Sequence, residues 1–138
     1  MCPGKERVSY LAKSSRELLN RNAMKLFEVQ SEIGFADGEI LGCERVGSAF
    51  VVRVRAWNSK GLRVEFKEVQ LVLDLIPGDL SGFYRYDEET ELLRKALGYA
   101  YDDPPNKHPF RHFVFMNNDD QPCLEVIAAE MEVTADRA

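Results

Sequence analysis

The segment FVVRVRAWNSKGLRVEFKEVQLVLDL, residues 50–75, decides the fold. Apolar and polar side chains alternate along it on both sides of a turn-forming tract, residues 58–61, and this period of two is typical of strands with one buried face. The segment therefore predicts an antiparallel hairpin. Beyond Phe66 the apolar positions change from even to odd numbers, which predicts a bulge near Lys67 and Glu68.

Residues that oppose each other in an antiparallel pair share a face, so the register must bring the two apolar faces together. We expect Val54 opposite Phe66 and Ala56 opposite Val64. The loop is then Ser59-Lys60-Gly61, with Gly61 in the left-handed conformation that a type I turn followed by a bulge requires. The outer face of this hairpin is a candidate interaction surface, because Arg and Trp are frequent in binding hot spots. It carries Arg53, Arg55, Trp57 and Arg63.

Two amphipathic helices are predicted beside the strands. Ser14-Ser15-Arg16-Glu17 fits a capping box, and apolar residues at helical spacing continue it, so we expect a helix from about Ser15 to Val29. Asp87 is a plausible cap for a second, central helix with an apolar stripe that includes Leu93 and Leu97 and with a stop near Gly98.

Further strands are expected at residues 39–45 and in a final hairpin, residues 111–116 and 123–133; residues 80–86 form either a short strand or an irregular loop. The predicted fold class is α+β: an antiparallel sheet, a meander of about five to seven strands, with the N-terminal and central helices packed against it.

The chain of 138 residues, 45% hydrophobic and 30% charged, is predicted to be one soluble globular domain, 1–138, with residues 1–13 and 134–138 loosely held. It has no apolar run that could span a membrane and no signal peptide, so we expect no membrane partner and a cytoplasmic location. The widely spaced Cys2, Cys43 and Cys123 predict reduced thiols and no disulfide framework.

Charge is distributed unevenly within the net charge of -5. Residues 77–138 carry thirteen acidic and six basic side chains. This balance argues against a nucleic-acid partner, because phosphate binding needs an excess of Lys and Arg. It favours a basic protein partner docked on the acidic C-terminal half, and the alternative is a solvated surface that only aids solubility.

No segment carries a catalytic or cofactor motif, which favours a non-enzymatic role without a cofactor. On a strand, His108 and His112 would lie on one side but about 13 Å apart, too far for one metal ion. The carboxylates near the second helix are interpreted as helix-end charges, and residues 117–120 as a hairpin turn, not a calcium loop. Tyrosines and aspartates around this helix extend the candidate interaction surface: Tyr84, Tyr86, Tyr99, Tyr101, Asp102 and Asp103.

Residues 35–40, FADGEI, followed by residues 52–58 and 62–66, resemble small bacterial domains of unknown function, some of which are grouped with polymorphic-toxin immunity proteins. Those domains often show a polar-Asp-x-x-Ile start, a strand that ends in a Trp or Gly turn, and a return strand that ends in Phe. The His that often precedes the Asp is Ala36 here. The resemblance implies an immunity-like binding role and assigns no functional residues.

These patterns lead to two main hypotheses. The first is a non-enzymatic protein-binding domain, immunity-like, whose acidic C-terminal half binds a basic protein. The alternative is a small-ligand-binding or enzymatic domain with a cleft between sheet and helices, lined by Tyr84, Tyr86, His108 and His112. A third possibility is a homodimer that protects the edges of an open sheet.

Overall fold

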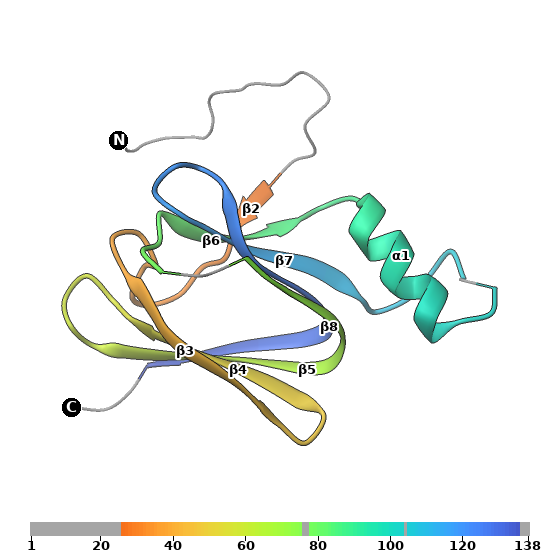
Figure 1. Ribbon diagram of the computed structural model, residues 1–138, viewed down its shortest axis with the longest axis horizontal. Helices are drawn as coiled ribbons and strands as arrows, with labels where there is room; N and C mark the ends of the chain where they lie inside the picture. The colour runs from red at the N-terminus through yellow and green to blue at the C-terminus, as the bar shows by residue number, and fades with distance from the viewer. Residues whose placement is uncertain (1–25, 76–77, 104, 136–138) are drawn as a thin grey trace.

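The structure of the protein, a computed structural model, describes residues 26–75, 78–103 and 105–135. Within these residues seven strands form one antiparallel sheet, and one ten-residue helix, α1, lies against it (Figure 1). The elements are β2 (Leu26–Glu28), β3 (Glu39–Val46), β4 (Ala49–Arg55), β5 (Gly61–Asp74), β6 (Gly82–Tyr86), α1 (Glu91–Ala100), β7 (Arg111–Met116) and β8 (Pro122–Ala135).

The predicted α+β class is wrong, because the described part of the chain is nearly all β. Leu26–Glu28, where the first helix was expected to end, is strand β2 and pairs with Tyr84 to Tyr86 of β6. The guanidinium of Arg85 lies 5.6 Å from the ring centroid of Phe27, an additional contact between the two strands. The remainder of the predicted helix, residues 15–25, lies outside the described residues.

The central hairpin forms with the predicted faces but in a different register. Phe50 opposes Phe66 and Val54 opposes Leu62, so the partner of each residue is four positions away from the expected one. The tight turn is made by residues 57–59: Ser59 N–H donates to Ala56 O at 2.9 Å, and Ser59, not Gly61, has the left-handed φ of 70°. The Asn58 side chain accepts from Lys60 N–H at 3.1 Å, which favours this earlier turn.

Strand β5 joins two groups of consecutive strands. The sheet order is β2-β6-β7-β8-β5-β4-β3, so the pairing of β5 with β8 connects the β3-β4-β5 meander to the β6-β7-β8 meander. The phase change predicted near Lys67 and Glu68 is visible: Glu68 has a φ of 53°, and the register with β8 shifts between Val69 and Leu71. Irregularities of this kind bend a strand and increase its twist.

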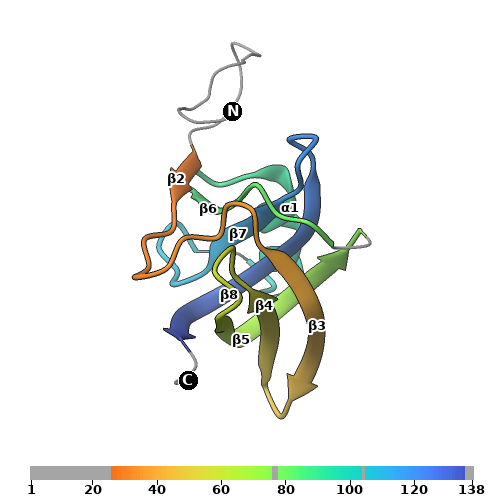
Figure 2. The ribbon, with the colours of Figure 1, turned by 90° about the vertical axis from the view of Figure 1, so that its left-hand side faces the viewer.

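The sheet curls so that the start of edge strand β3 reaches the segment that leads into β6 (Figure 2). Ile40 N–H at the start of β3 donates to Gly78 O at 2.8 Å, and Leu80 N–H, just before β6, donates to Gly38 O at 2.9 Å. The result is a partly closed barrel. Its interior holds a group of aromatic rings whose contacting pairs have centroids 4.1 to 6.4 Å apart. The group consists of Phe35, Phe66, Phe83, Phe113 and Phe115.

Helix α1 covers the outside of this barrel over β5, β7 and β8 (Figure 1). It buries Leu93, Ala96 and Leu97 in a second core with Phe110 and Ile127. The helix begins later than predicted, since Thr90 and not Asp87 is its N-cap, and it continues past Gly98 to Ala100.

The other predicted strands are present in the structure. Residues 82–86 form a strand, and the final hairpin is confirmed as β7 and β8. Residues 134 and 135, expected to be loosely held, belong to β8. Residues 1–13 and 136–138 lie outside the described residues. The one described helix is too short and too polar to cross a lipid bilayer.

Candidate functional site

A buried histidine connects the start of α1 to the sheet. His112 on β7 faces α1, and only 4% of its side chain is exposed. Its Nδ1 lies 2.6 Å from the hydroxyl oxygen of Thr90, the N-cap of α1, and its Nε2 lies 2.6 Å from a carboxylate oxygen of Glu125 on β8. Thr90 also accepts the Leu93 N–H at 3.1 Å.

One assignment of protons satisfies every group in this network. Because the Thr90 oxygen accepts the Leu93 amide, its own proton is free to be donated to Nδ1 of a neutral His112. The opposite nitrogen then carries a proton and donates it to the Glu125 carboxylate. The network therefore holds the first turn of α1 to β7 and β8.

Tyr86 of β6 completes the buried end of the site. Its ring lies 4.5 Å from the imidazole of His112, centroid to centroid. Burial, and secondly the neighbouring Glu125 carboxylate, raise the pKa of Tyr86 from 10.0 to about 12. The folded protein therefore favours the neutral phenol of Tyr86 over the phenolate.

A cleft of about 320 Å³ opens beside this network. The segment before α1, the loop at residues 105–110 and the ends of β6 and β7 contribute to it. Its lining includes Tyr86, Glu89, Leu93, Lys107, His108 and His112. The predicted ligand residues Tyr86, His108 and His112 thus come together, whereas Tyr84 is not part of the lining.

His108 differs from His112 in having one ring nitrogen without a partner. Only 4% of its side chain is exposed, its Nε2 lies 3.3 Å from a carboxylate oxygen of Glu89, and its ring stacks on Phe110. Among the described residues, His108 Nδ1 is the one buried side-chain nitrogen or oxygen without a hydrogen-bond partner. A second hollow, about 390 Å³ between residues 30–33 and the ends of β5 and β8, contains no such atom in the described part of the chain.

Thr90, His112 and Glu125 have the composition of a hydroxyl–imidazole–carboxylate triad, but not its accessibility. Thr90 is 8% exposed, does not line the cleft, and its oxygen caps α1. A nucleophile must reach a substrate carbonyl, so this set is structural. Within the described residues there is also no group of three or more His, Cys, Asp or Glu side chains arranged to hold a metal ion.

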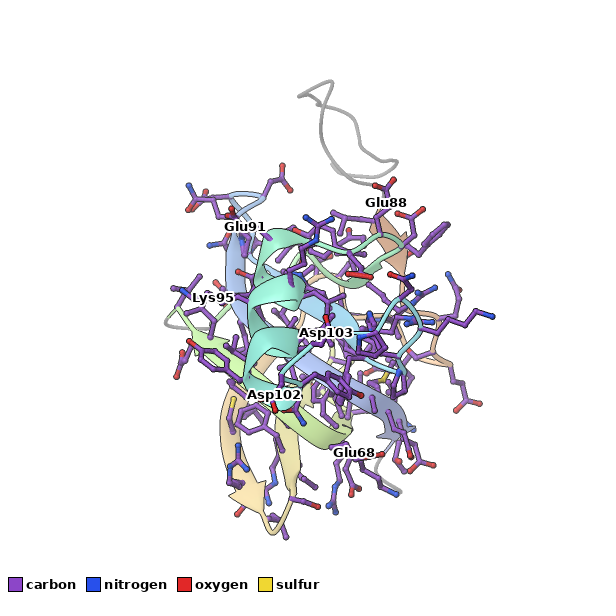
Figure 3. The ribbon with its side chains drawn as sticks, turned by 90° about the vertical axis from the view of Figure 1, so that its right-hand side faces the viewer. Glu68, Glu88, Glu91, Lys95, Asp102 and Asp103 are labelled. Atoms are coloured by element: carbon purple, nitrogen blue, oxygen red, sulfur yellow. The ribbon has the colours of Figure 1, made fainter. Side chains whose placement is uncertain are left out.

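The C-terminal end of α1 presents a different surface. Tyr99 is 71% exposed, and the exposed Asp102 and Asp103 follow directly after the helix. Figure 3 shows both aspartates, together with Glu68 of β5, on the side of the molecule that α1 covers. We call Tyr99, Asp102, Asp103 and Glu68 the α1 C-terminal patch. No ion pair involves its three carboxylates within residues 26–75, 78–103 and 105–135.

The other predicted interaction residues are separate from this patch. On the outer face of the hairpin, Arg53 pairs with Glu44, Arg55 pairs with Glu39, and Arg63 lies 3.6 Å from Glu65. Their charge is therefore largely neutralised within the protein, and Trp57 is left 66% exposed at the turn. Each of the three arginines on this face thus has a carboxylate within 4 Å.

Two predicted surface tyrosines are structural. A Cβ atom on Gly82 would lie 2.6 Å from the Tyr84 hydroxyl, so this partly buried ring covers the backbone of its own strand. Tyr101 packs on Phe110, with ring centroids 6.3 Å apart, in the core under α1.

Sequence reasoning missed Thr90, Glu89 and Glu125 as partners of the histidines. The sequence does point to Glu125, because it is the one charged residue in the apolar run CLEVIAA, residues 123–129. A carboxylate inside a buried strand needs a hydrogen-bond donor, and a nearby histidine can supply one. Thr90 and Glu89 carried no comparable signal.

Comparison with known proteins found no matching protein-family model, no matching curated protein and no matching solved structure.

Proposed function

We propose that this chain is a non-enzymatic protein-binding domain that docks a basic partner protein on the α1 C-terminal patch. In its immunity-like form, the partner is a basic toxin that binding neutralises. We place this activity in the cytoplasm, where the free thiols of Cys43 and Cys123 would stay reduced.

The observation that carries the proposal is the position of Asp102 and Asp103 next to the C-terminal end of α1, where negative charge is unfavourable. The C-terminal end of a helix carries partial negative charge, so cations stabilise it and anions do not. The last turn of α1 has no basic residue, and two exposed aspartates follow it. Residues that oppose local stability are expected at functional sites. A cationic partner would relieve this repulsion.

Tyr99 supplies the apolar part of the docking surface. Tyrosine is enriched in binding hot spots because it buries a large ring with little loss of conformational entropy. Carboxylates at the rim act mainly on the association rate and on the choice of partner. The patch therefore combines an exposed aromatic anchor with unpaired charges of one sign.

Site-specific photocrosslinking tests the proposal. A photoreactive phenylalanine analogue is placed at position 99 in one protein and at position 57 in a matched control, because Trp57 is a similarly exposed aromatic residue. We expect a covalent adduct with a basic protein in extract of the source cells from position 99, and a decrease of this adduct at high salt. Equal adducts from both positions, or none from position 99, would refute the docking surface.

The same experiment separates hetero-association from self-association. Edge strand β3 exposes Leu41 by 56% and Val46 by 51%, so pairing with a second copy is the other arrangement to consider. Adducts made only of two copies of this chain would favour the homodimer.

A further inference from the structure

We propose that the cleft at the N-terminal end of α1 binds a small zwitterion of the free α-amino-acid class. In the bound state, the ligand amino group donates a hydrogen bond to Nδ1 of His108, and the ligand carboxylate pairs with Lys107 at the same cleft. This site is distinct from the α1 C-terminal patch, and its test is independent of the protein-binding proposal.

The unpaired nitrogen of His108 defines the donor half of the ligand. Because Nε2 of His108 faces the Glu89 carboxylate at 3.3 Å, the neutral ring carries its proton there and presents a lone pair at Nδ1. A buried acceptor without a hydrogen-bond partner destabilises the unliganded protein. A ligand N–H restores the missing hydrogen bond, and the neighbouring Glu88 and Glu89 favour a positively charged donor.

The charged side chains that line the cleft define the carboxylate half of the ligand. Its lining holds three acidic residues, Asp87, Glu88 and Glu89, and three basic residues, Arg85, Lys107 and Arg111. Arg111 is already engaged, since its Nη1 donates to Phe110 O at 3.0 Å. Lys107 is exposed and has no ion-pair partner among the described residues. A lining balanced in this way suits a ligand with both charges and no net charge.

The size of the cleft limits the ligand to a small molecule. Ligand pockets usually measure about 300–1,000 Å³, and this cleft lies at the low end, about 320 Å³. Because Nδ1 itself is buried, entry of a ligand requires side chains that line the cleft to move aside.

Nitrogen NMR of the histidine side chains in the full chain tests the proposal with three matched probes: L-alanine, L-alaninamide, which lacks the carboxylate, and propionate, which lacks the amino group. We expect a saturable shift of His108 Nδ1 with alanine, a shift at several-fold weaker affinity with alaninamide, and no shift with propionate. His112, already bonded at both nitrogens, should not respond and so reports an intact fold.

Two variants complete the test. Measured by isothermal titration calorimetry, which needs no His108 signal, His108→Leu should weaken alanine binding at least about tenfold, whereas His108→Asn, which keeps an acceptor close to the position of Nδ1, should restore part of it. Lys107→Ala should remove the preference for alanine over alaninamide. The proposal is overturned if no probe shifts His108 at millimolar concentrations, if propionate shifts it equally, or if His108→Leu binds alanine like the wild type.

Discussion

The two ends of α1 differ in how their polar groups are paired. At the N-terminal end, Thr90 and His112 are buried and make hydrogen bonds at 2.6 to 3.1 Å. At the C-terminal end, Tyr99 is 71% exposed, and Asp102 and Asp103 are exposed without ion pairs in the described part of the chain. Buried, paired groups hold the helix to the sheet, whereas exposed, unpaired groups are available to a partner. Mutations of Thr90 or His112 should therefore change stability, and mutations in the α1 C-terminal patch should change binding.

Removal of the buried imidazole should have the largest effect. His112→Ala removes two hydrogen bonds and leaves the carboxylate of Glu125, 12% exposed, without its donor. We expect a loss of about 3 kcal/mol in the free energy of unfolding, measured by urea denaturation. Tyr99→Ala is the matched control at the other end and should stay within about 0.5 kcal/mol of the wild type. Similar losses of unfolding free energy in the two variants would contradict the proposed difference between the two ends of α1.

Measurements at high pH should show how much the neutral phenol of Tyr86 contributes to the free energy of unfolding. Its pKa is raised from 10.0 to about 12 in the folded protein, so the unfolded chain loses this proton first as pH rises. The contribution of the Tyr86 phenol to stability is fully present below pH 10 and is lost between about pH 10 and 12. Wild type should lose about 2 kcal/mol more over this range than Tyr86→Phe, because Cys43 and the other titrating groups are common to both proteins. Parallel pH profiles would mean that the phenol is not stabilised in its neutral form.

The cap of α1 should have a smaller effect. Thr90→Val keeps the shape of the side chain but removes both the acceptor for Leu93 N–H and the donor to His112. We expect a loss of about 1–2 kcal/mol in thermal or urea unfolding. Thr90→Ser preserves the hydroxyl and should lose less than half as much. If Val and Ser are equivalent at this position, the hydroxyl does not link the helix to the sheet.

The smallest stability effect, with the opposite sign, is expected at the C-terminal end. The double variant Asp102→Lys, Asp103→Lys replaces anions with cations next to the negative end of α1. We expect a gain of a few tenths of a kcal/mol in the free energy of unfolding. The same exchange at Asp119 and Asp120, in the β7–β8 turn, is the control and should not produce this gain. A loss of stability at 102 and 103 would show that these aspartates are structural.

The alternation of apolar and polar residues predicted the strands well, but it could not predict which strands pair when they are far apart in the sequence. The faces of residues 50–75 and the bulge near Glu68 follow from the period of two in the sequence. The register was wrong because Ser59 takes the left-handed position that glycine usually occupies. The pairing of β5 with β8 joins residues about 60 positions apart, and alternation along one strand carries no information about its distant partner.

The cleft with His108 and His112 was predicted only in part, because it too depends on contacts between residues far apart in the sequence. Spacing placed His108 and His112 on one side of the chain, and both line the same cleft. It could not show that one is fully bonded and the other is not, since their partners Thr90, Glu89 and Glu125 come from other segments. The helical prediction for the end of residues 15–29 was wrong because Leu26–Glu28 pairs with β6, and pairing with a strand edge overrides a helical period.

The most direct test of the docking surface is the affinity of the photocrosslinked basic protein for three forms of this chain. They are the wild type, the double variant Asp102→Lys, Asp103→Lys, and the double variant Asp119→Lys, Asp120→Lys, which has the same net charge. We expect the exchange at 102 and 103 to weaken binding at least about thirtyfold, the exchange at 119 and 120 to weaken it less than about threefold, and added salt to reduce the difference. Equal weakening by the two exchanges would show that net charge alone, and not the end of α1, determines binding.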